Sequence, residues 1–360
     1  MLSFIFSEHT SQEWFTISNE KLFQTGLADW EKSLWRFIAD WYSDSPFVTL
    51  RTSGSTGTPK LIEVSKEMMC VSARKTLQFL NIKPNNTALL CLSADYIAGK
   101  MMIVRSILGN LRLFAVAPSG KPLMDFSRFV DFSAMVPMQV FQQLKEVDSL
   151  NRIGKLLVGG GAVSSQLSES LQVCSCMAYE SYGMTETVSH IALRRINGNE
   201  RQEGFVPMKN VSVSLDERGC LLIDAPDLLT KSLQTNDSAE ILPSGEFRIL
   251  GRIDNVINSG GIKIQPEEIE RQITPFFTRN FVISCVTDDK LGEKLVLVSE
   301  ESLNPEQIQL INSNLNPYQH IRSYLQLSPF PQTTTHKIDR PAVKRFVSEH
   351  LETPLNDIFH

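Results

Sequence analysis

The chain has 360 residues, of which 42% are hydrophobic and 21% charged, and its formal net charge at pH 7 is -5. These values are ordinary for a globular enzyme of about two domains, and the absence of a basic block argues against a nucleic-acid-binding protein. The N-terminus lacks a basic signal-peptide start, and no apolar run approaches the ~20 residues of a membrane span. The six cysteines are dispersed, which is typical of reduced core thiols. We therefore expect a cytoplasmic protein without a membrane span.

The first half of the chain shows strands alternating with helices. The predicted helices cover 27–37, 66–80 and 97–108, and the predicted strands cover 47–50, 61–64, 88–92, 111–116 and 156–158. Such alternation indicates βαβ units and a largely parallel sheet. Ligands of such sheets bind beyond the carboxyl ends of the strands, where two glycine-rich turns follow predicted strands.

The second half changes character. Short strands at 211–215, 219–223 and 245–250 predict a β-rich subdomain, and a boundary falls near 251–254. Beyond it, Pro266 and the acidic residues after it favour a helix start, followed by strands at 281–284 and 294–298 and a helix at 306–314. The expected fold class is α/β. A large N-terminal domain (1–252) has layered, mostly parallel sheets and a β-rich subdomain, and a small mobile α+β domain (253–360) follows.

One loop has the composition of a phosphate-binding site. Five hydroxyl side chains and two glycines precede a lysine between Thr52 and Lys60. Glycines allow close approach of the backbone, hydroxyls and amides bind phosphate oxygens, and the lysine adds a charge. A flexible linker is the simpler alternative, but the loop is short and lies between two predicted strands. A Walker A loop is excluded because Pro59 stands where its second glycine would be.

This loop resembles the phosphate loop of the adenylate-forming superfamily, which includes acyl-CoA synthetases, firefly luciferase and the adenylation domains of nonribosomal peptide synthetases. Glu180 to Thr187 resembles the Tyr-Gly-x-Thr-Glu motif of that superfamily. The resemblance implies that Tyr182 stacks on adenine, Thr185 contacts the α-phosphate, and Glu186 helps hold Mg²⁺. A capped helix start is the alternative reading of this motif. The ATP- or AMP-binding candidates are Thr52, Ser53, Gly54, Ser55, Thr56, Gly57, Lys60, Gly160, Gly161, Ala162, Glu180, Ser181, Tyr182, Gly183, Asp237 and Arg252.

Three further segments match the superfamily in order along the chain. In Thr235-Asn236-Asp237 the ribose-binding aspartate is kept, and asparagine replaces the usual glycine as the next most tolerant residue for positive φ. Between 251 and 264, the resemblance makes Arg252 a ribose ligand and Asp254 the hinge, and it places Gly260, Gly261 and Lys263 in the CoA channel. Lys337 lies in a segment resembling the C-terminal lysine motif, which implies an electrostatic role in adenylation. A solvated surface lysine is the alternative.

The order of these motifs implies an ATP-dependent acid–CoA ligase with an acyl-AMP intermediate, using ATP, Mg²⁺ and coenzyme A. Arg105 lies on an otherwise apolar predicted helix. A buried cation needs a partner, and the guanidinium of arginine has the geometry to bind a carboxylate. A snorkelling or salt-bridged surface arginine is equally compatible with the chemistry. The arginine and the Ser-His that follows the Thr-Glu motif resemble the o-succinylbenzoate–CoA ligases of menaquinone biosynthesis.

That resemblance implies an acid pocket formed by Tyr96, Arg105, Gly159, Thr187 and Ser189, in which Tyr96 stands where relatives carry a histidine. Catalysis is assigned to Lys337, Thr185 and Glu186. Two alternatives stay open, namely another aryl or short carboxylic acid as substrate and a nucleotide-binding relative without catalysis. A homodimer is compatible with the sequence.

Overall fold

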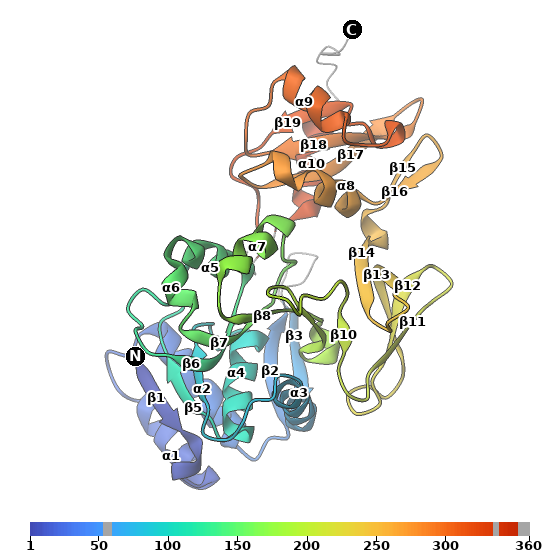
Figure 1. Ribbon diagram of the computed structural model, residues 1–360. Coiled ribbons are helices and arrows are strands. Elements are labelled where there is room, and N and C mark those ends of the chain that lie inside the picture. Colours follow the sequence, from blue (N-terminus) through green and yellow to red (C-terminus); the bar gives the residue numbers. More distant parts are fainter. Residues whose placement is uncertain (53–59, 334–337, 352–360) are drawn as a thin grey trace.

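A computed structural model describes residues 1–52, 60–333 and 338–351, and for Arg51, Thr52, Lys60 and Leu61 it describes the backbone only. Its largest element is an eight-stranded sheet (Figure 1). The neighbouring strands β5, β4, β6, β7 and β8 run parallel, and antiparallel strands flank them, as expected for an α/β fold. In spatial order the strands are β1 (Leu2–Ile5), β5 (Arg112–Ala115), β4 (Thr87–Leu90), β6 (Val130–Met135), β7 (Ile153–Val158), β8 (Met177–Gly183), β9 (His190–Arg195) and β10 (Val206–Pro207).

Alternate residues of the parallel strands face two apolar layers. In β4, Ala88 and Leu90 pack in a layer with the first helices of the chain, whereas Leu89 packs in the opposite layer. Helices therefore cover both faces of the sheet, as parallel sheets require. The helices of the first layer are α2 (Asp29–Tyr42), α3 (Lys66–Phe79) and α4 (Ile97–Leu108), with α1 (Ser11–Leu22) packed on α2. The second layer contains α5 (Pro137–Gln143), α6 (Val147–Leu150) and α7 (Ser165–Ser170).

Two smaller sheets accompany the large one. The hairpin of β2 (Phe47–Thr52) and β3 (Lys60–Ser65) is antiparallel. A four-stranded antiparallel sheet forms the predicted β-rich part, and its inner face packs against Tyr182 of β8. Its strands are β11 (Ser212–Leu215), β12 (Cys220–Asp224), β13 (Leu233–Ile241) and β14 (Phe247–Arg252).

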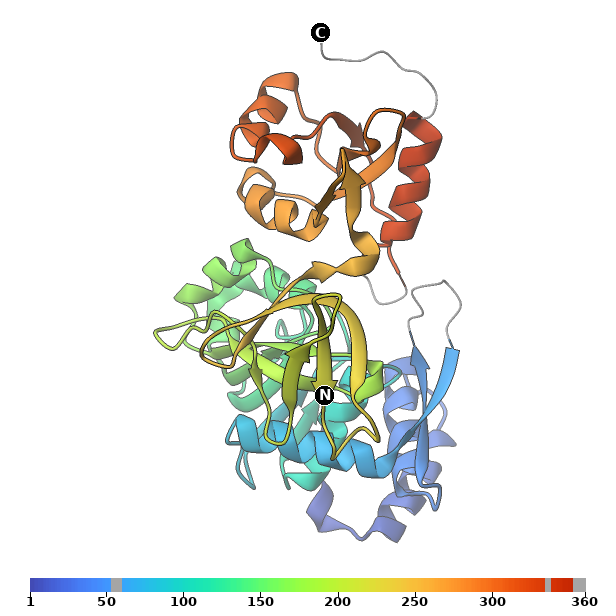
Figure 2. The ribbon, with the colours of Figure 1, turned by 90° about the vertical axis from the view of Figure 1, so that its right-hand side faces the viewer.

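The residues after β14 form a separate body at the top of Figures 1 and 2. Its five-stranded sheet is flanked by three helices, and Pro266 occupies the first turn of α8 as predicted. Among the described residues, no buried apolar cluster contains side chains from both sides of Val256. The elements are β15 (Ile257–Ser259), β16 (Ile262–Ile264), α8 (Pro266–Ile273), β17 (Phe281–Asp288), β18 (Gly292–Ser299), α9 (Pro305–Asn312), β19 (Ser323–Gln326) and α10 (Arg340–Leu351).

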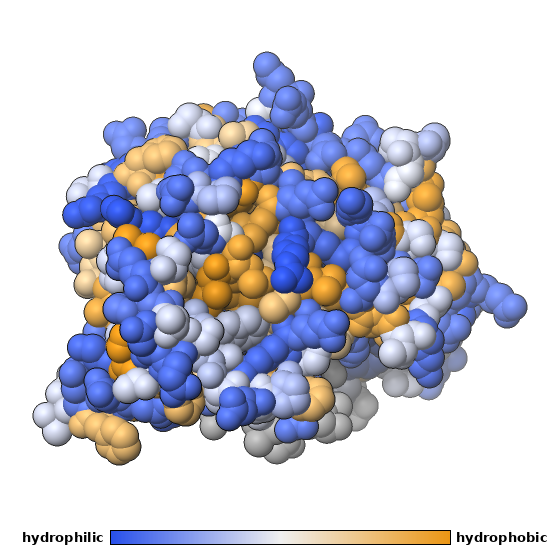
Figure 3. Space-filling view, turned by 90° about the horizontal axis from the view of Figure 1, so that it is seen from below, coloured by the Kyte–Doolittle hydropathy of each residue, from blue (hydrophilic) through white to orange (hydrophobic). Residues whose placement is uncertain are grey.

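The face farthest from this last body is shown in Figure 3, where apolar side chains gather in the middle and polar ones frame them. Over the described part of the chain, every helix is too short or too polar to cross a membrane.

Candidate active site

Several of the predicted site residues lie at or beyond the carboxyl ends of the parallel strands. The glycine turn 159–162 follows β7, the Tyr-Gly motif ends β8, and Tyr96 precedes the first turn of α4, which follows β4. Parallel strands end at one edge of a sheet, so the sequence-distant motifs come together there. Tyr96 is 42% exposed.

Several predicted residues lie outside the described part of the chain. Ser53, Gly54, Ser55, Thr56, Gly57 and Lys337 belong to this group. Thr52 and Lys60 are paired at the adjoining ends of β2 and β3, so the predicted phosphate loop joins two antiparallel strands. On either side of the Lys337 segment, Gln332 and Ile338 form an isolated β-bridge.

Close contacts with neighbouring atoms explain two of the glycines. A Cβ on Gly183 would collide with the main chain of Ser189 and His190, and a Cβ on Gly159 would collide with the Ser181 hydroxyl. Gly160 has a φ of +82°, which favours glycine. The glycines therefore allow β8, the turn after β7 and the segment before β9 to lie close together.

The Glu180 side chain stabilises the glycine turn that follows β7. Its carboxylate accepts a hydrogen bond of 2.8 Å from the Val163 amide, and its other oxygen pairs with Arg194. The side chain is 4% exposed. Glu180 is thus engaged in holding the segment after Gly161 and Ala162.

Tyr182 connects the Tyr-Gly motif to the β-rich part. Its ring packs against Phe205 and Phe247, with centroids 5.8 and 5.3 Å away. Its hydroxyl donates a 2.6 Å hydrogen bond to Asp237 Oδ2. Burial, and then the nearby Asp237 carboxylate, raise the pKa of Tyr182, so the hydroxyl stays protonated and remains a donor.

Asp237 and Arg252 lie opposite each other on β13 and β14. Arg252 Nη1 donates to Asp237 Oδ1 at 3.1 Å, while Arg252 Nη2 donates to Asp254 Oδ2 at 2.7 Å. The hydrogen bond from Arg252 lowers the pKa of Asp254. The structure therefore brings together the adenine, ribose and hinge candidates Tyr182, Asp237, Arg252 and Asp254.

Asn236 has a different function from the one expected. The φ of Asn236 is not positive, so a tolerance of positive φ does not explain why asparagine stands here. Its amide Nδ2 instead donates to Asp254 Oδ1 and Oδ2 at 3.1 and 3.3 Å, and its carbonyl accepts from Arg218 at 3.0 Å. The side chain links the β-rich sheet to the predicted hinge residue.

A strained turn separates the Thr-Glu motif from β9. Val188 is buried and has φ of 65° and ψ of -49°, and the Ser189 amide donates to the Thr187 carbonyl at 2.7 Å, which defines a γ-turn. Thr187 is fully buried, and its hydroxyl bonds the Met184 and Ser189 carbonyls. Thr187 therefore stabilises the turn that orients Ser189.

Arg105 is buried, with 2% exposure, and is not the surface arginine considered as an alternative. Its Nη2 donates to Ser189 Oγ at 2.9 Å, its Nε has no partner, and no acidic residue pairs with it among the described residues. Burial lowers the pKa of Arg105 to about 9. A buried guanidinium without a counter-charge has the properties of a carboxylate-binding group.

Thr185 and Glu186 lie in a short 3₁₀ turn, and Glu186 is exposed. The described residues contain no cluster of three or more His, Cys, Asp or Glu side chains that could hold a metal alone. Mg²⁺ is commonly held by one or two carboxylates together with substrate phosphates, so a single carboxylate at Glu186 is compatible with this ion.

The predicted CoA-channel residues lie on a hairpin of the last body. Gly260 and Gly261 form the two-residue turn between β15 and β16, with φ of +58° and +80°, as such turns require. Lys263 is exposed on β16, opposite Asn258.

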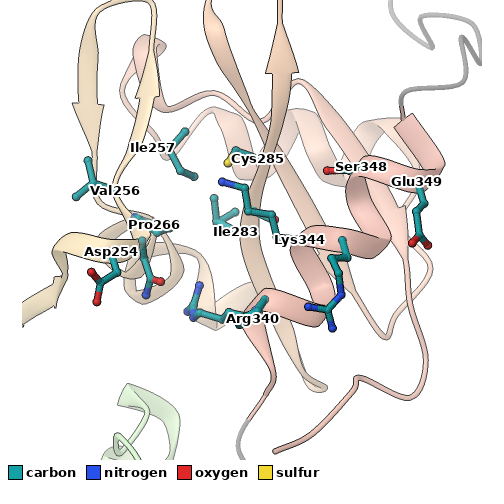
Figure 4. A pocket seen from close by; sticks show the side chains of 14 residues that line it. Asp254, Val256, Ile257, Pro266, Ile283, Cys285, Arg340, Lys344, Ser348 and Glu349 are labelled. Atoms are coloured by element: carbon teal, nitrogen blue, oxygen red, sulfur yellow. The ribbon is translucent and has the colours of Figure 1, made fainter. Parts of the chain in front are cut away.

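A separate cavity of about 560 Å³ lies between the Asp254 segment and α10 (Figure 4). Two of its cations are already paired, because Arg340 contacts Glu270 at 2.5 Å and Lys344 contacts Glu293 at 3.3 Å. Burial raises the pKa of the Cys285 thiol in its wall to about 11, so the thiol is protonated at neutral pH. The cavity thus offers neither an unpaired charge from these two residues nor a reactive nucleophile.

The sequence analysis did not identify the residues that hold His190 and Asn236 in place. Thr76 on α3 contacts His190, and Arg218 holds Asn236. His190 is adjacent to Ser189 in a motif already noted, but no sequence pattern indicates Thr76, which reaches His190 only through the packing of α3 on the sheet.

Comparisons with known proteins identify relatives over most of the chain. The 2-succinylbenzoate–CoA ligase of Escherichia coli K12 is 26% identical over 313 residues, covering 82% of this chain and 68% of that protein. An acyl-CoA synthetase (AMP-forming)/AMP-acid ligase II-like protein from Dyadobacter fermentans is 35% identical, with a TM-score of 0.61, covering 91% of this chain and 97% of that one.

An o-succinylbenzoate coenzyme A synthetase from Bacillus subtilis, in complex with ATP and a magnesium ion, shares the fold with a TM-score of 0.70 at 18% identity, covering 94% of this chain and 82% of that one. The family model for AMP-binding enzymes matches residues 10–221, more than half of the chain. The chain therefore belongs to the AMP-binding enzyme family, within the adenylate-forming superfamily.

Proposed function

We propose that this protein is an AMP-forming acid–CoA ligase that converts o-succinylbenzoate to o-succinylbenzoyl-CoA, a step of menaquinone biosynthesis. Membership of the AMP-binding enzymes and the names of the relatives support the reaction class. The observation that carries the choice of acid is the buried guanidinium of Arg105, which pairs with no carboxylate among the described residues. o-Succinylbenzoate has two carboxylates, of which one reacts and the other needs a counter-charge.

The chemistry follows two steps at one site. A carboxylate oxygen of the acid attacks the α-phosphorus of ATP, the bond between the α-phosphorus and the bridging oxygen breaks, and pyrophosphate leaves. The CoA thiol then loses its proton, its sulfur attacks the acyl carbon, and AMP leaves with the carboxyl oxygen. Lys337 is assigned to the charge that develops in the first step, and Thr185 to the α-phosphate.

The residues of the β-rich part are assigned to the nucleoside. Asp237 and Arg252 offer an acceptor and a donor to the ribose hydroxyls, and Tyr182 offers its ring to the adenine. Arg105, Ser189 and the turn at Thr187 are assigned to the acid, and Tyr96 and Gly159 are assigned to the same pocket. Mg²⁺ at Glu186 would supply charge compensation for the phosphates.

Residues 1–252 are assigned to the binding of ATP and the acid, and residues 253–360 to a second domain that rotates about Asp254. The absence of a shared apolar cluster among the described residues supports this division. Polar contacts cross the boundary, for example the hydrogen bonds from Arg271 to the Ile249 and Leu250 carbonyls at 2.9 and 3.0 Å. Polar interfaces of this kind are compatible with domain rotation, which would carry the Gly260–Gly261 turn and Lys263 toward CoA.

Pyrophosphate release from ATP tests the proposal, with o-succinylbenzoate, benzoate and a short fatty acid compared in parallel. We expect release with o-succinylbenzoate and AMP release after CoA is added. Arg201→Met serves as a control variant, because Arg201 is a surface arginine paired with Glu169. Release with a different acid would retain the ligase chemistry and reject the substrate. No release with any acid, despite ATP binding, would reject the enzyme function.

A further inference from the structure

A chain of hydrogen bonds leads from Arg105 into the core. Arg105 Nη2 donates to Ser189 Oγ at 2.9 Å, and Ser189 Oγ lies 3.3 Å from His190 Nδ1. His190 Nε2 lies 2.9 Å from Thr76 Oγ1, which in turn donates to the Ser72 carbonyl at 3.1 Å. Arg105, His190 and Thr76 are all buried, so water is largely excluded from this chain.

The carbonyl of Ser72, at one end of this series of hydrogen bonds, determines which group donates in each of them. A carbonyl can only accept, so the Thr76 hydroxyl uses its proton on Ser72 and must accept from His190 Nε2–H. His190 is then the Nε2–H tautomer, and its Nδ1 accepts the Ser189 hydroxyl proton. Ser189 Oγ thereby keeps its lone pairs for Arg105. The Ser72 carbonyl of α3 thus determines the orientation of the Ser189 hydroxyl.

We propose that His190 and Thr76 are positioning residues that hold Ser189, and through it the Arg105 guanidinium, for the second carboxylate of the acid. This inference rests on the proposed function. Ser189 is the partner found for Arg105 among the described residues, and Arg105 Nε has none. The orientation of the guanidinium therefore depends on this single acceptor, whose own orientation depends on His190.

The neutral form of His190 is required by this arrangement. Burial, together with the positive charge of Arg105, lowers the pKa of His190 well below its ordinary value. Arg105 on α4 is the charged group acting on His190 among the described residues, whereas α3 presents the neutral Thr76. A protonated His190 would direct Nδ1–H at Ser189 and displace the Ser189 proton from its acceptor.

Kinetics of Thr76 variants test the inference, because the hydroxyl of Thr76 bonds the Ser72 carbonyl and His190, and Thr76 is assigned to neither the nucleotide nor the acid. Thr76→Val keeps the shape and removes the hydroxyl. We expect its KM for o-succinylbenzoate to rise about 5- to 10-fold, the value of one buried hydrogen bond, with the KM for ATP unchanged. Thr76→Ser, which keeps the hydroxyl, should restore the KM. A fall in kcat alone, or equal changes in both KM values, would overturn the positioning function.

A second measurement does not depend on turnover. In wild-type protein with ¹⁵N-labelled histidine, the NMR signals of His190 at pH 7 should show protonated Nε2 and unprotonated Nδ1. The opposite tautomer or a charged ring would overturn the inference even if o-succinylbenzoate is the substrate. If the predicted tautomer is found and o-succinylbenzoate does not react, the proposed substrate fails and the hydrogen-bond chain stands, so the two failures are distinguishable.

Discussion

Replacement of Arg105 by methionine should stabilise the empty protein and weaken binding of the acid. Burial lowers the pKa of Arg105 to about 9, which corresponds to a cost of about 5 kcal/mol for the unpaired charge. Methionine fills a similar volume without this cost, although Ser189 loses one donor. Replacement of even a paired set of buried charges by apolar residues of similar volume is often neutral or stabilising by about 1–4 kcal/mol, and for Arg105, which pairs with no carboxylate among the described residues, we expect a gain in this range.

The effect on the acid should have the opposite sign. Loss of one partner of a buried charge pair costs about 2–5 kcal/mol, so the KM for o-succinylbenzoate should rise about 30- to 5,000-fold. The KM for ATP should stay near its wild-type value. Urea denaturation of the empty protein and initial rates at varied acid concentration measure the two effects.

Arg340→Met is the matched control for stability. Arg340 is partly buried, with 29% of its side chain exposed, and its guanidinium contacts the Glu270 carboxylate at 2.5 Å. Removal of this partner leaves an unpaired carboxylate, which should destabilise the protein by about 3–5 kcal/mol. If Arg105→Met lost as much stability as Arg340→Met, or kept its affinity for the acid, the interpretation of Arg105 as an unpaired binding group would be wrong.

Three further predictions concern His190, Asn236 and Lys337. The pKa of His190 is lowered in the folded state, so below about pH 6.5 only the unfolded state binds this proton. The free energy of unfolding should therefore fall there by up to ~1.36 kcal/mol per pH unit. In urea denaturation, His190→Gln should not show this part of the pH dependence. Asn236→Gly removes the contact with Asp254, so limited proteolysis should cut residues 253–257 about 5-fold faster; an unchanged rate would exclude a restraint on the hinge. Lys337→Ala should abolish pyrophosphate release while AMP release from supplied acyl-AMP and CoA persists, and loss of both would contradict the assigned step.

The sequence predicts the architecture well where its signals are local. Apolar periodicity located α4, and Pro266 with its acidic neighbours located α8, because both depend on residues close together in the chain. The parallel pairing of β4 and β5 also follows from the alternation of strands and helices. The short strands β1 and β10 at the edges of the large sheet were not predicted. The strand β1 pairs with β5, which is distant in the sequence, and β10 has only two residues.

The site could be predicted at the level of residue types and not of contacts. The resemblance brought Tyr182, Asp237 and Arg252 together, yet the hydrogen bonds among them depend on how the β-rich sheet packs on β8. Asn236 was predicted to replace glycine because asparagine tolerates positive φ, whereas its side chain forms a hydrogen bond with Asp254. Whether Arg105 is buried could not be decided from a helix pattern, because burial depends on Ser189 and the turn at Val188.

The separation of the apolar clusters at Val256 has a consequence for cooperativity. Clusters that share no buried side chains are coupled weakly, so heat or denaturant should melt them in separate transitions, and a single free energy of unfolding would not describe the chain. ATP bound by residues before the boundary would then raise the melting temperature of one transition and leave the other nearly in place. A calorimetric scan with and without ATP would thus assign each transition to its part of the chain.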